Sequence, residues 1–99
     1  MTTNILVIGR DHAILEVIER LINAHENWRA TITGTEEEAI GLFKGAKYPI
    51  VLVSAGFSAQ EEEIIRQKLT TVDPEVVVSR HYGGGSGLLE NEILGILKK

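Results

Sequence analysis

The residues of this chain that could take part in chemistry lie where its apolar segments end. A guanidinium, a carboxylate and two hydroxyls follow such segments, and a glycine-rich stretch comes shortly after the last hydroxyl. Guanidinium groups, hydroxyls and unhindered glycine amides are groups with which proteins bind anions. The pattern therefore predicts a candidate anion-binding site. Its residues are Arg10, Asp11, Ser54, Ser79, Gly83, Gly84, Gly85 and Ser86.

The glycine-rich stretch 83–87 has two interpretations. Unhindered amides that precede a helix can cradle a phosphate. The stretch has neither the lysine and spacing of a P-loop nor the position of a dinucleotide fingerprint after the first strand. We therefore interpret it as a flexible connection and keep phosphate or nucleotide binding as the alternative.

Catalytic and metal chemistry find little support in the residue types. The chain has no cysteine, which excludes thiolate nucleophiles and cysteine ligands. Ser54 lacks the Gly-X-Ser-X-Gly context of a hydrolase nucleophile. The three histidines, His12, His25 and His81, have no short metal-ligand spacing. We expect no enzyme activity, no catalytic residue, no metal site and no cofactor.

Four short segments predict the strands that would position these side chains. The continuous apolar runs are typical of strands buried on both faces of a parallel sheet. The partial alternation in the second segment indicates an edge strand. The predicted strands are Asn4–Gly9, Trp28–Thr33, Ile50–Val53 and Glu75–Ser79.

Four further segments have apolar residues at helical spacing. Asp11 is placed to cap the first helix, and Thr35 with Glu38 and Ser58 with Glu61 have the spacing of reciprocal capping boxes. The predicted helices are His12–His25, a segment from Thr35 to about Ala46, a segment that opens at Ser58, and about Leu88–Lys98.

The glutamate runs 36–38 and 61–63 open the second and third of these helices. Negative charge is favoured at a helix N-terminus, so we interpret both runs as solvated first turns. In the third helix we expect the apolar face to be formed by Ile64, Ile65 and Leu69.

Strands that alternate with helices imply right-handed crossovers and a parallel sheet covered on both faces. We expect an α/β fold, a three-layer sandwich around a four-stranded parallel sheet in the order 2-1-3-4. One domain should span residues 1–99. Ligands of such sheets bind beyond the carboxyl ends of the strands, near the switch point between the first and third strands. The candidate site residues should therefore converge there.

The segments 5–14, 34–40, 48–54 and 76–79 together carry a resemblance to a known family. They are similar, in this order, to the first strand and helix entry, the second helix, the third strand and the fourth strand of the receiver domain of two-component response regulators. The resemblance covers roughly the whole chain. It implies a flavodoxin-like receiver fold and a role in signalling, with Ser79 at the position of the family's switch residue.

The residues on which phosphorylation of a receiver depends differ in this chain. Gly9 and Arg10 stand where the family has two adjacent acidic residues that hold Mg²⁺, and Ser54 stands in place of the phosphoacceptor aspartate. Aspartyl phosphorylation needs a carboxylate nucleophile and a metal held by hard oxygen ligands. We expect Arg10 to repel a divalent cation and to pair with an anion or with Asp11. The resemblance thus implies a degenerate receiver that is not phosphorylated on aspartate.

A second departure lies near the C-terminus. Only residues 80–85 separate Ser79 from Ser86, so the fourth helix of a receiver is missing. If Leu88-Leu89 matches the family's fifth strand, Glu90 stands near the position of its lysine. A continuous last helix would include these residues instead, and both alternatives stay open.

A looser resemblance connects the chain to cobalamin-binding domains, which share this order of strands and helices. Their Asp-X-His-X-X-Gly motif is absent, because Asp11 and His12 are adjacent and Leu15 stands where a glycine is expected. Cobalamin is therefore the weaker form of the ligand-binding alternative.

Composition limits the remaining possibilities. The chain has 99 residues, of which 43% are hydrophobic, and a formal net charge of −4. These values predict a folded domain and argue against a nucleic-acid partner, which would need clustered lysine and arginine. The first residues lack the pattern of a signal peptide or membrane span, so we expect a cytoplasmic protein without membrane contact. Our leading hypothesis is a non-catalytic receiver-like protein interaction module. We expect it to form a homodimer, because a small chain with open edges gains by association. The alternative is a domain that binds a small anionic ligand.

Overall fold

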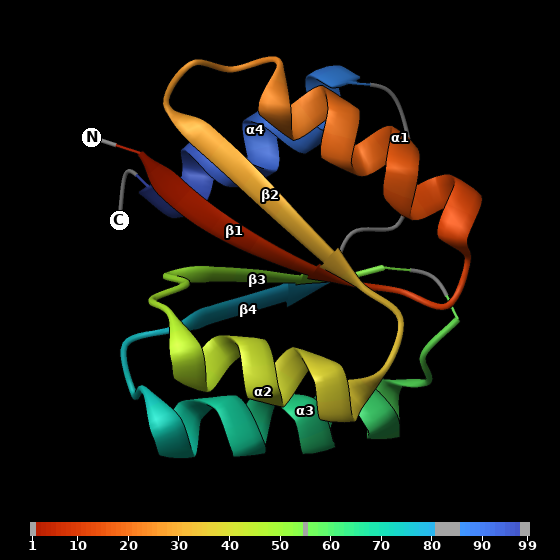
Figure 1. Cartoon of the computed structure of the whole chain (residues 1–99), viewed down its shortest axis with the longest axis vertical. Helices are drawn as coiled ribbons and strands as arrows, with labels where there is room; N and C mark the ends of the chain where they lie inside the picture. The colour runs from red at the N-terminus through yellow and green to blue at the C-terminus, as the bar shows by residue number, and fades with distance from the viewer. Residues whose placement is uncertain (1, 55, 81–85, 98–99) are drawn as a thin grey trace.

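The computed structural model of the chain describes residues 2–54, 56–80 and 86–97. Strands and helices alternate along them, and the four strands pair in parallel in the order β2-β1-β3-β4. Helices α1 and α4 cover one face of the sheet, and α2 and α3 cover the other (Figure 1). The elements are β1 (Thr3–Ile8), α1 (His12–Asn23), β2 (Trp28–Thr33), α2 (Glu36–Gly45), β3 (Ile50–Val53), α3 (Ala59–Val72), β4 (Val77–Arg80) and α4 (Ser86–Leu97). The predicted α/β class, the three layers and the strand order are confirmed.

The helices begin at the predicted side-chain caps. Asp11 accepts a hydrogen bond from the Ile14 amide at 3.2 Å. Ser58 and Glu61 form the expected reciprocal box, in which each side chain accepts from the other residue's amide. These contacts are local, so they depend on little beyond the spacing of the residues.

The box predicted at Thr35 forms only in part. The Thr35 hydroxyl accepts from the Glu38 amide at 3.1 Å, as expected. The Glu38 carboxylate accepts from the hydroxyl of Thr33 at 2.6 Å instead of reaching back to the cap. Thr33 ends β2, so this carboxylate ties the strand to the helix that follows it.

The core consists of two apolar layers, one on each face of the sheet. Alternate residues of the two inner strands contribute to opposite layers, as strand geometry requires. Leu6, Ile8, Val51 and Val53 pack against α2 and α3, and their neighbours pack against α1 and α4. Ile50–Val53 is buried on both faces of the sheet, as its continuous apolar run predicts.

One residue of the predicted apolar face of α3 is exposed. Ile65 and Leu69 are buried, but 41% of Ile64 is accessible to solvent. Residues four apart lie on one helix face, whereas a neighbouring residue is turned by about 100°. The sheet accommodates the stripe through Ile65 and Leu69, which leaves Ile64 at its border.

The structure decides between a fifth strand and a continuous last helix near the C-terminus. The last helix begins at Ser86 and includes Leu88-Leu89, so the fifth strand is wrong and the continuous helix is confirmed. Leu89 and Ile93 of this helix are buried against the α1 side of the sheet. Strand β4 also continues one residue further than predicted, so Arg80, not Ser79, is its last residue. Among the described residues, no helix has both the length and the apolar character needed to cross a membrane.

Candidate functional site

The carboxyl ends of all four strands lie at the same level of the sheet. Ile8 is paired with Thr33 on one side and with Val53 on the other, and Val53 is paired with Arg80. The loops that follow these residues therefore meet at one edge, as the predicted strand order requires. Of the candidate residues, Arg10, Asp11 and Ser54 lie in these loops.

Arg10 turns toward α3 and is held there by three groups. Its guanidinium donates to the Gly56 carbonyl at 2.7 Å. It forms a two-pronged ion pair with Glu61, with Nη2–Oε2 at 2.6 Å and Nη1–Oε1 at 3.2 Å. It also lies over the Phe57 ring, 4.4 Å from the ring centroid. Paired planar contacts of this kind are the strongest that arginine makes with a carboxylate.

The partner of Arg10 is thus Glu61 and not Asp11. Asp11 is used as the cap of α1. The expectation of an Arg10–Asp11 pair is wrong, because the Asp11 carboxylate binds the Ile14 amide while the Arg10 guanidinium binds Glu61 and the Gly56 carbonyl. The carboxylate of Glu61 occupies the guanidinium face at which an external anion would bind.

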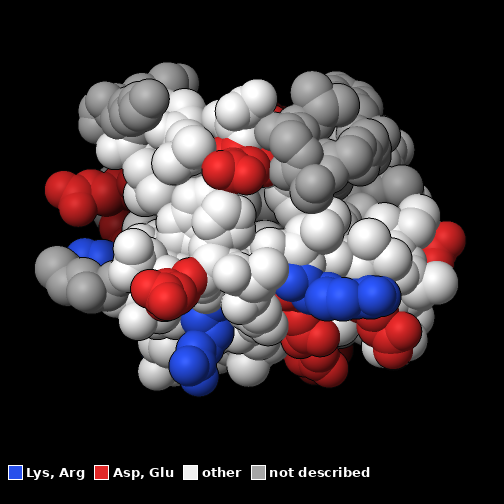
Figure 2. All heavy atoms as spheres, turned by 90° about the horizontal axis from the view of Figure 1, so that it is seen from above, with Lys and Arg blue, Asp and Glu red and all other residues white. Residues whose placement is uncertain are grey.

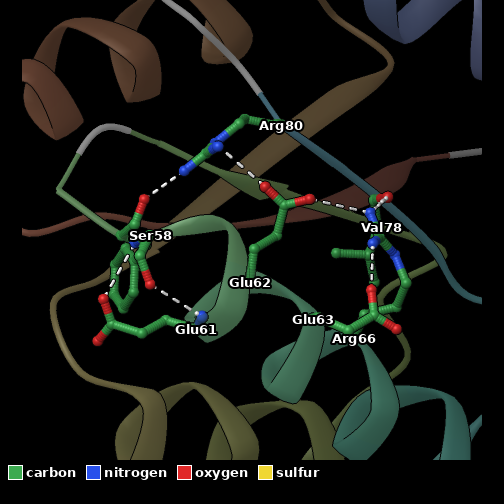
Figure 3. A network of polar contacts seen from close by, with 8 residues as sticks. Ser58, Glu61, Glu62, Glu63, Arg66, Val78 and Arg80 are labelled. Carbon is green, nitrogen blue, oxygen red and sulfur yellow. Dashed lines mark hydrogen bonds and ion pairs between the residues drawn. The ribbon is translucent and has the colours of Figure 1, made fainter.

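A second arginine, Arg80, makes the same kind of contact with the loop between β3 and α3, and sequence reasoning missed it. Arg80 donates to the Phe57 carbonyl, and its Nε forms an ion pair with Oε1 of Glu62 at 3.1 Å. Figure 3 shows Arg80 reaching from the end of β4 toward α3. Only 13% of the Glu62 side chain is exposed.

Two arginines therefore clamp the loop between β3 and α3. They bind two consecutive carbonyls, those of Gly56 and Phe57, and two consecutive glutamates of the first turn of α3. The prediction that the run 61–63 is only a solvated first turn is wrong for its first two members. The contacts join residues up to 51 positions apart in the chain, so no local pattern indicates them.

Ser54 is placed in a tight and buried position. Only 3% of its surface is exposed, and its amide donates to the Ile8 carbonyl at 2.7 Å. Its Cβ lies 3.0 Å from the point where a Cβ on Gly9 would stand. Since Val53 packs against α2 and α3, strand alternation turns Ser54 to the opposite face, toward α1.

Among the candidate residues whose side chains the structure describes, Arg10 is separated from Ser54 and Ser79. By the same alternation Ser79 lies on the α1 and α4 side, because Val78 belongs to the layer under α3. Arg10 is bound on the α3 side. Gly83, Gly84 and Gly85 lie outside the described residues, and Ser86 is the first residue of α4.

A pocket of about 340 Å³ lies at this edge of the sheet, beside the Arg10–Glu61 pair. It combines apolar side chains of α3 and its preceding loop with charged groups that already have partners. Glu36 pairs with Lys68 at 2.7 Å, and Glu61 pairs with Arg10. The residues that line it are Arg10, Gly34, Thr35, Glu36, Phe57, Glu61, Ile64 and Ile65. Among the residues that the structure describes, no group of three or more histidine, cysteine, aspartate and glutamate side chains is arranged to hold a metal ion.

The clamp at Arg10 changes the acidity of its partner. Hydrogen bonds from the Arg10 guanidinium, and then from the Ser58 amide, lower the pKa of Glu61 from its ordinary value of 4.5 to about 2. A carboxyl whose pKa is lowered by folding stabilises the fold above its unfolded pKa and loses that contribution as the pH falls through the folded pKa. The contribution of Glu61 should therefore decline between pH 4.5 and about 2.

We expect the difference in unfolding free energy between the wild type and Glu61→Gln to be constant above pH 4.5 and to shrink below it. Urea unfolding at a series of pH values measures this difference. Glu37→Gln, in the exposed first turn of α2, is the matched control for loss of one surface carboxylate. A difference that stays unchanged down to about pH 2 would mean that the Arg10–Glu61 pair does not form in solution.

The comparison with solved structures identifies the fold. A two-component response regulator from Clostridium difficile is 16% identical, with a TM-score of 0.79, and the match covers 99% of this chain and 98% of that one. A CheY-like receiver domain from Methylobacillus flagellatus is 11% identical, with a TM-score of 0.75 and coverage of 97% and 99%. A protein from Burkholderia thailandensis that is provisionally assigned to pilus assembly is 22% identical, with a TM-score of 0.63 and coverage of 95% and 80%. No protein-family model matches the sequence, and the search of curated proteins finds no match. The likeness shows that the chain has the receiver fold.

Proposed function

We propose that this chain, which has the fold of response-regulator receivers, is a non-catalytic protein interaction module that works without phosphorylation on aspartate. Residues 1–99 act in this proposal as one receiver-like domain in the cytoplasm. The observation that carries it is the clamp: a guanidinium, bound to Glu61 and to the Gly56 carbonyl, stands at the edge where the resemblance places a metal ion. The nucleophile position holds a buried serine hydroxyl.

Two physical effects oppose phosphorylation in this arrangement. A fixed positive charge repels Mg²⁺, and the loop carbonyl and carboxylate that could attract a cation are already bound to Arg10. Without a carboxylate at residue 54, no acyl phosphate can form there. Because the charged groups at this edge are paired within the chain, the proposal places the contacts with a partner on the outer surface of the domain.

We expect incubation with acetyl phosphate and Mg²⁺ to leave the mass of the protein unchanged, and beryllofluoride with Mg²⁺ to leave its Tm unchanged. Mass spectrometry and thermal unfolding measure the two effects, with an active receiver domain as the positive control. A phosphoryl adduct on any aspartate would contradict the proposal.

The same thermal measurement tests the anion-binding alternative, which the paired state of Arg10 disfavours. Phosphate, nucleotides and cobalamin should raise the Tm if they bind the native state. If a ligand raises the Tm of the wild type but not that of Arg10→Ala, the chain is a ligand-binding domain and the proposed interaction module is wrong.

The surface that best fits a protein partner is the outer side of α1. Ile14 and Val17 are 38% and 47% exposed, and partly buried Leu21 continues the same stripe at the spacing of a helix face. Figure 2 looks onto this side of the molecule, where uncharged atoms cover much of the middle and most charged side chains lie toward the rim. Apolar patches of this kind are typical of interfaces.

The homodimer predicted from the sequence would use this stripe. Light scattering at high concentration tests it. If the wild-type chain stays monomeric there, the partner is a different protein.

A further inference from the structure

Strand β4 is the last strand of the sheet among the described residues, so its outer side is an edge. The Val77 amide donates to the Pro49 carbonyl at 3.0 Å, which directs the backbone groups of Val77 inward toward β3. In a parallel strand the N–H and C=O of the next residue point the opposite way. The backbone groups of Val78 therefore face outward. Outward-facing groups of this kind are a template for pairing with another strand.

The Val78 carbonyl is covered by a side chain of α3. Arg66 donates to it at 3.0 Å. Glu62 and Glu63 hold the guanidinium in place, at 3.1 Å and 3.0 Å. Figure 3 shows Arg66 between these carboxylates and the strand. Glu62 also binds Arg80, so the cover of the edge and the clamp on the loop between β3 and α3 meet at one carboxylate.

The opposite edge of the sheet is covered in a comparable way. On β2 the Ala30 amide donates to the side-chain oxygen of Asn23 at 2.8 Å. In both cases a helix side chain binds a backbone group of an edge strand, which is how edge strands are kept from pairing with other chains. Asn23 is a short side chain, whereas Arg66 is long, is 36% exposed, and is paired with two glutamates.

We propose that the outer edge of β4 is a latent self-association surface, which accepts β4 of a second copy of this chain when Arg66 leaves Val78. A two-fold axis beside Val78 would let its N–H donate to the Val78 carbonyl of the second copy and let its own carbonyl accept in return. Only the backbone groups of Val78 are needed for this pair. Val77, which is 36% exposed and directly precedes Val78 in β4, supplies apolar surface next to it.

Arg66→Met keeps most of the aliphatic stem and removes the guanidinium. We expect this variant to associate at least about tenfold more tightly than the wild type, since a charge-assisted hydrogen bond no longer competes for the carbonyl. Sedimentation velocity over a concentration series measures the association. Hydrogen exchange should show the Val78 amide becoming protected as the concentration of Arg66→Met rises.

Two double variants identify the surface. Proline at residue 78 removes the outward N–H without removing a bond to β3, whereas alanine keeps the N–H and loses similar packing. Arg66→Met with Val78→Ala should associate, and Arg66→Met with Val78→Pro should not. Glu63→Gln, which leaves Arg66 paired with Glu62 and Val78, should behave as the wild type. The proposal is overturned if Arg66→Met associates no more than the wild type, or if the proline and alanine double variants associate equally.

Discussion

Alanine at Gly56 is expected to lower the free energy of unfolding by about 1–3 kcal/mol and to displace Arg10. Gly56 has a φ of +102°, a backbone conformation that residues with a Cβ rarely adopt. An added Cβ would also lie 2.8 Å from the Cβ of Arg10. That atom is attached directly to the backbone of the loop after β1, so it cannot move aside as the end of a long side chain can. Relief of the clash requires one of the two loops to shift, and the clamp between them is then lost.

Urea unfolding measures the loss of stability, and the pH dependence of that stability reports the clamp. If Arg10 is displaced, the difference between Gly56→Ala and Gly56→Ala with Glu61→Gln should change less between pH 4.5 and about 2 than the corresponding difference in the wild-type background, because only the Ser58 amide then lowers the pKa of Glu61. Gly41→Ala is the matched control, because a Cβ at this helical glycine meets no atom within 4 Å. It should stabilise the protein by about 0.5–1 kcal/mol. A Gly56→Ala protein as stable as the wild type would show that the loop adopts another conformation.

Ile93→Ala is expected to lower the free energy of unfolding by about 2–5 kcal/mol. Ile93 is fully buried between α4 and the sheet, in the layer that also contains Leu89 and the helix α1. The variant therefore tests whether α4 belongs to the core in spite of the short connection through residues 81–85. Alanine favours helix, so the loss reports packing and not helix formation.

The control for this variant lies one turn further along the same helix. Leu97 is 43% exposed, and Leu97→Ala should change the stability by no more than about 0.5 kcal/mol. Denaturant unfolding with both variants compares the two positions. A loss below about 1 kcal/mol for Ile93→Ala would mean that α4 packs only loosely on the sheet and that the α1 side of the core is open.

The clamp also explains why the arrangement of the edge is unlike a binding site for anions. Both arginines at the carboxyl edge have carboxylate partners within the chain, and these partners belong to adjacent positions of one helix. A ligand would have to displace Glu61 from a two-pronged contact before it could reach Arg10. The cost of that exchange favours a function on the outer surface.

Much of the architecture could be predicted because it depends on patterns that are local in the chain. Continuous apolar runs at 4–8 and 50–53 indicate inner strands, and the caps at Asp11 and Ser58 follow from spacings of three residues. Alternation of strands and helices, with right-handed crossovers, then restricts the strand order. The position of the candidate site at the carboxyl edge follows from that order.

The partners of charged side chains could not be predicted in the same way. Arg10 had three acceptable neighbours in principle, an external anion, Asp11 or a distant carboxylate, and only the loop between β3 and α3 brings Glu61 to it. The local sequence does not predict the contacts of Arg80 and Arg66, since nothing in it distinguishes a clamped arginine from a solvated one. Ile64 shows the same limit for apolar residues, because helical spacing defines a stripe but not its border.

The sequence by itself determined that this chain is an α/β domain with a parallel sheet, and that Gly9, Arg10 and Ser54 stand where the resemblance to receivers would place carboxylates, because hydrophobic periodicity and residue type are properties of the chain alone. The tertiary structure decided that the Arg10 guanidinium is paired with Glu61 of the same chain, that Ser54 and Ser79 lie on the other face of the sheet, and that the sheet edge is covered by Arg66. These features depend on the direction of side chains across elements far apart in the sequence, and that direction exists only after the sheet and its helices have packed.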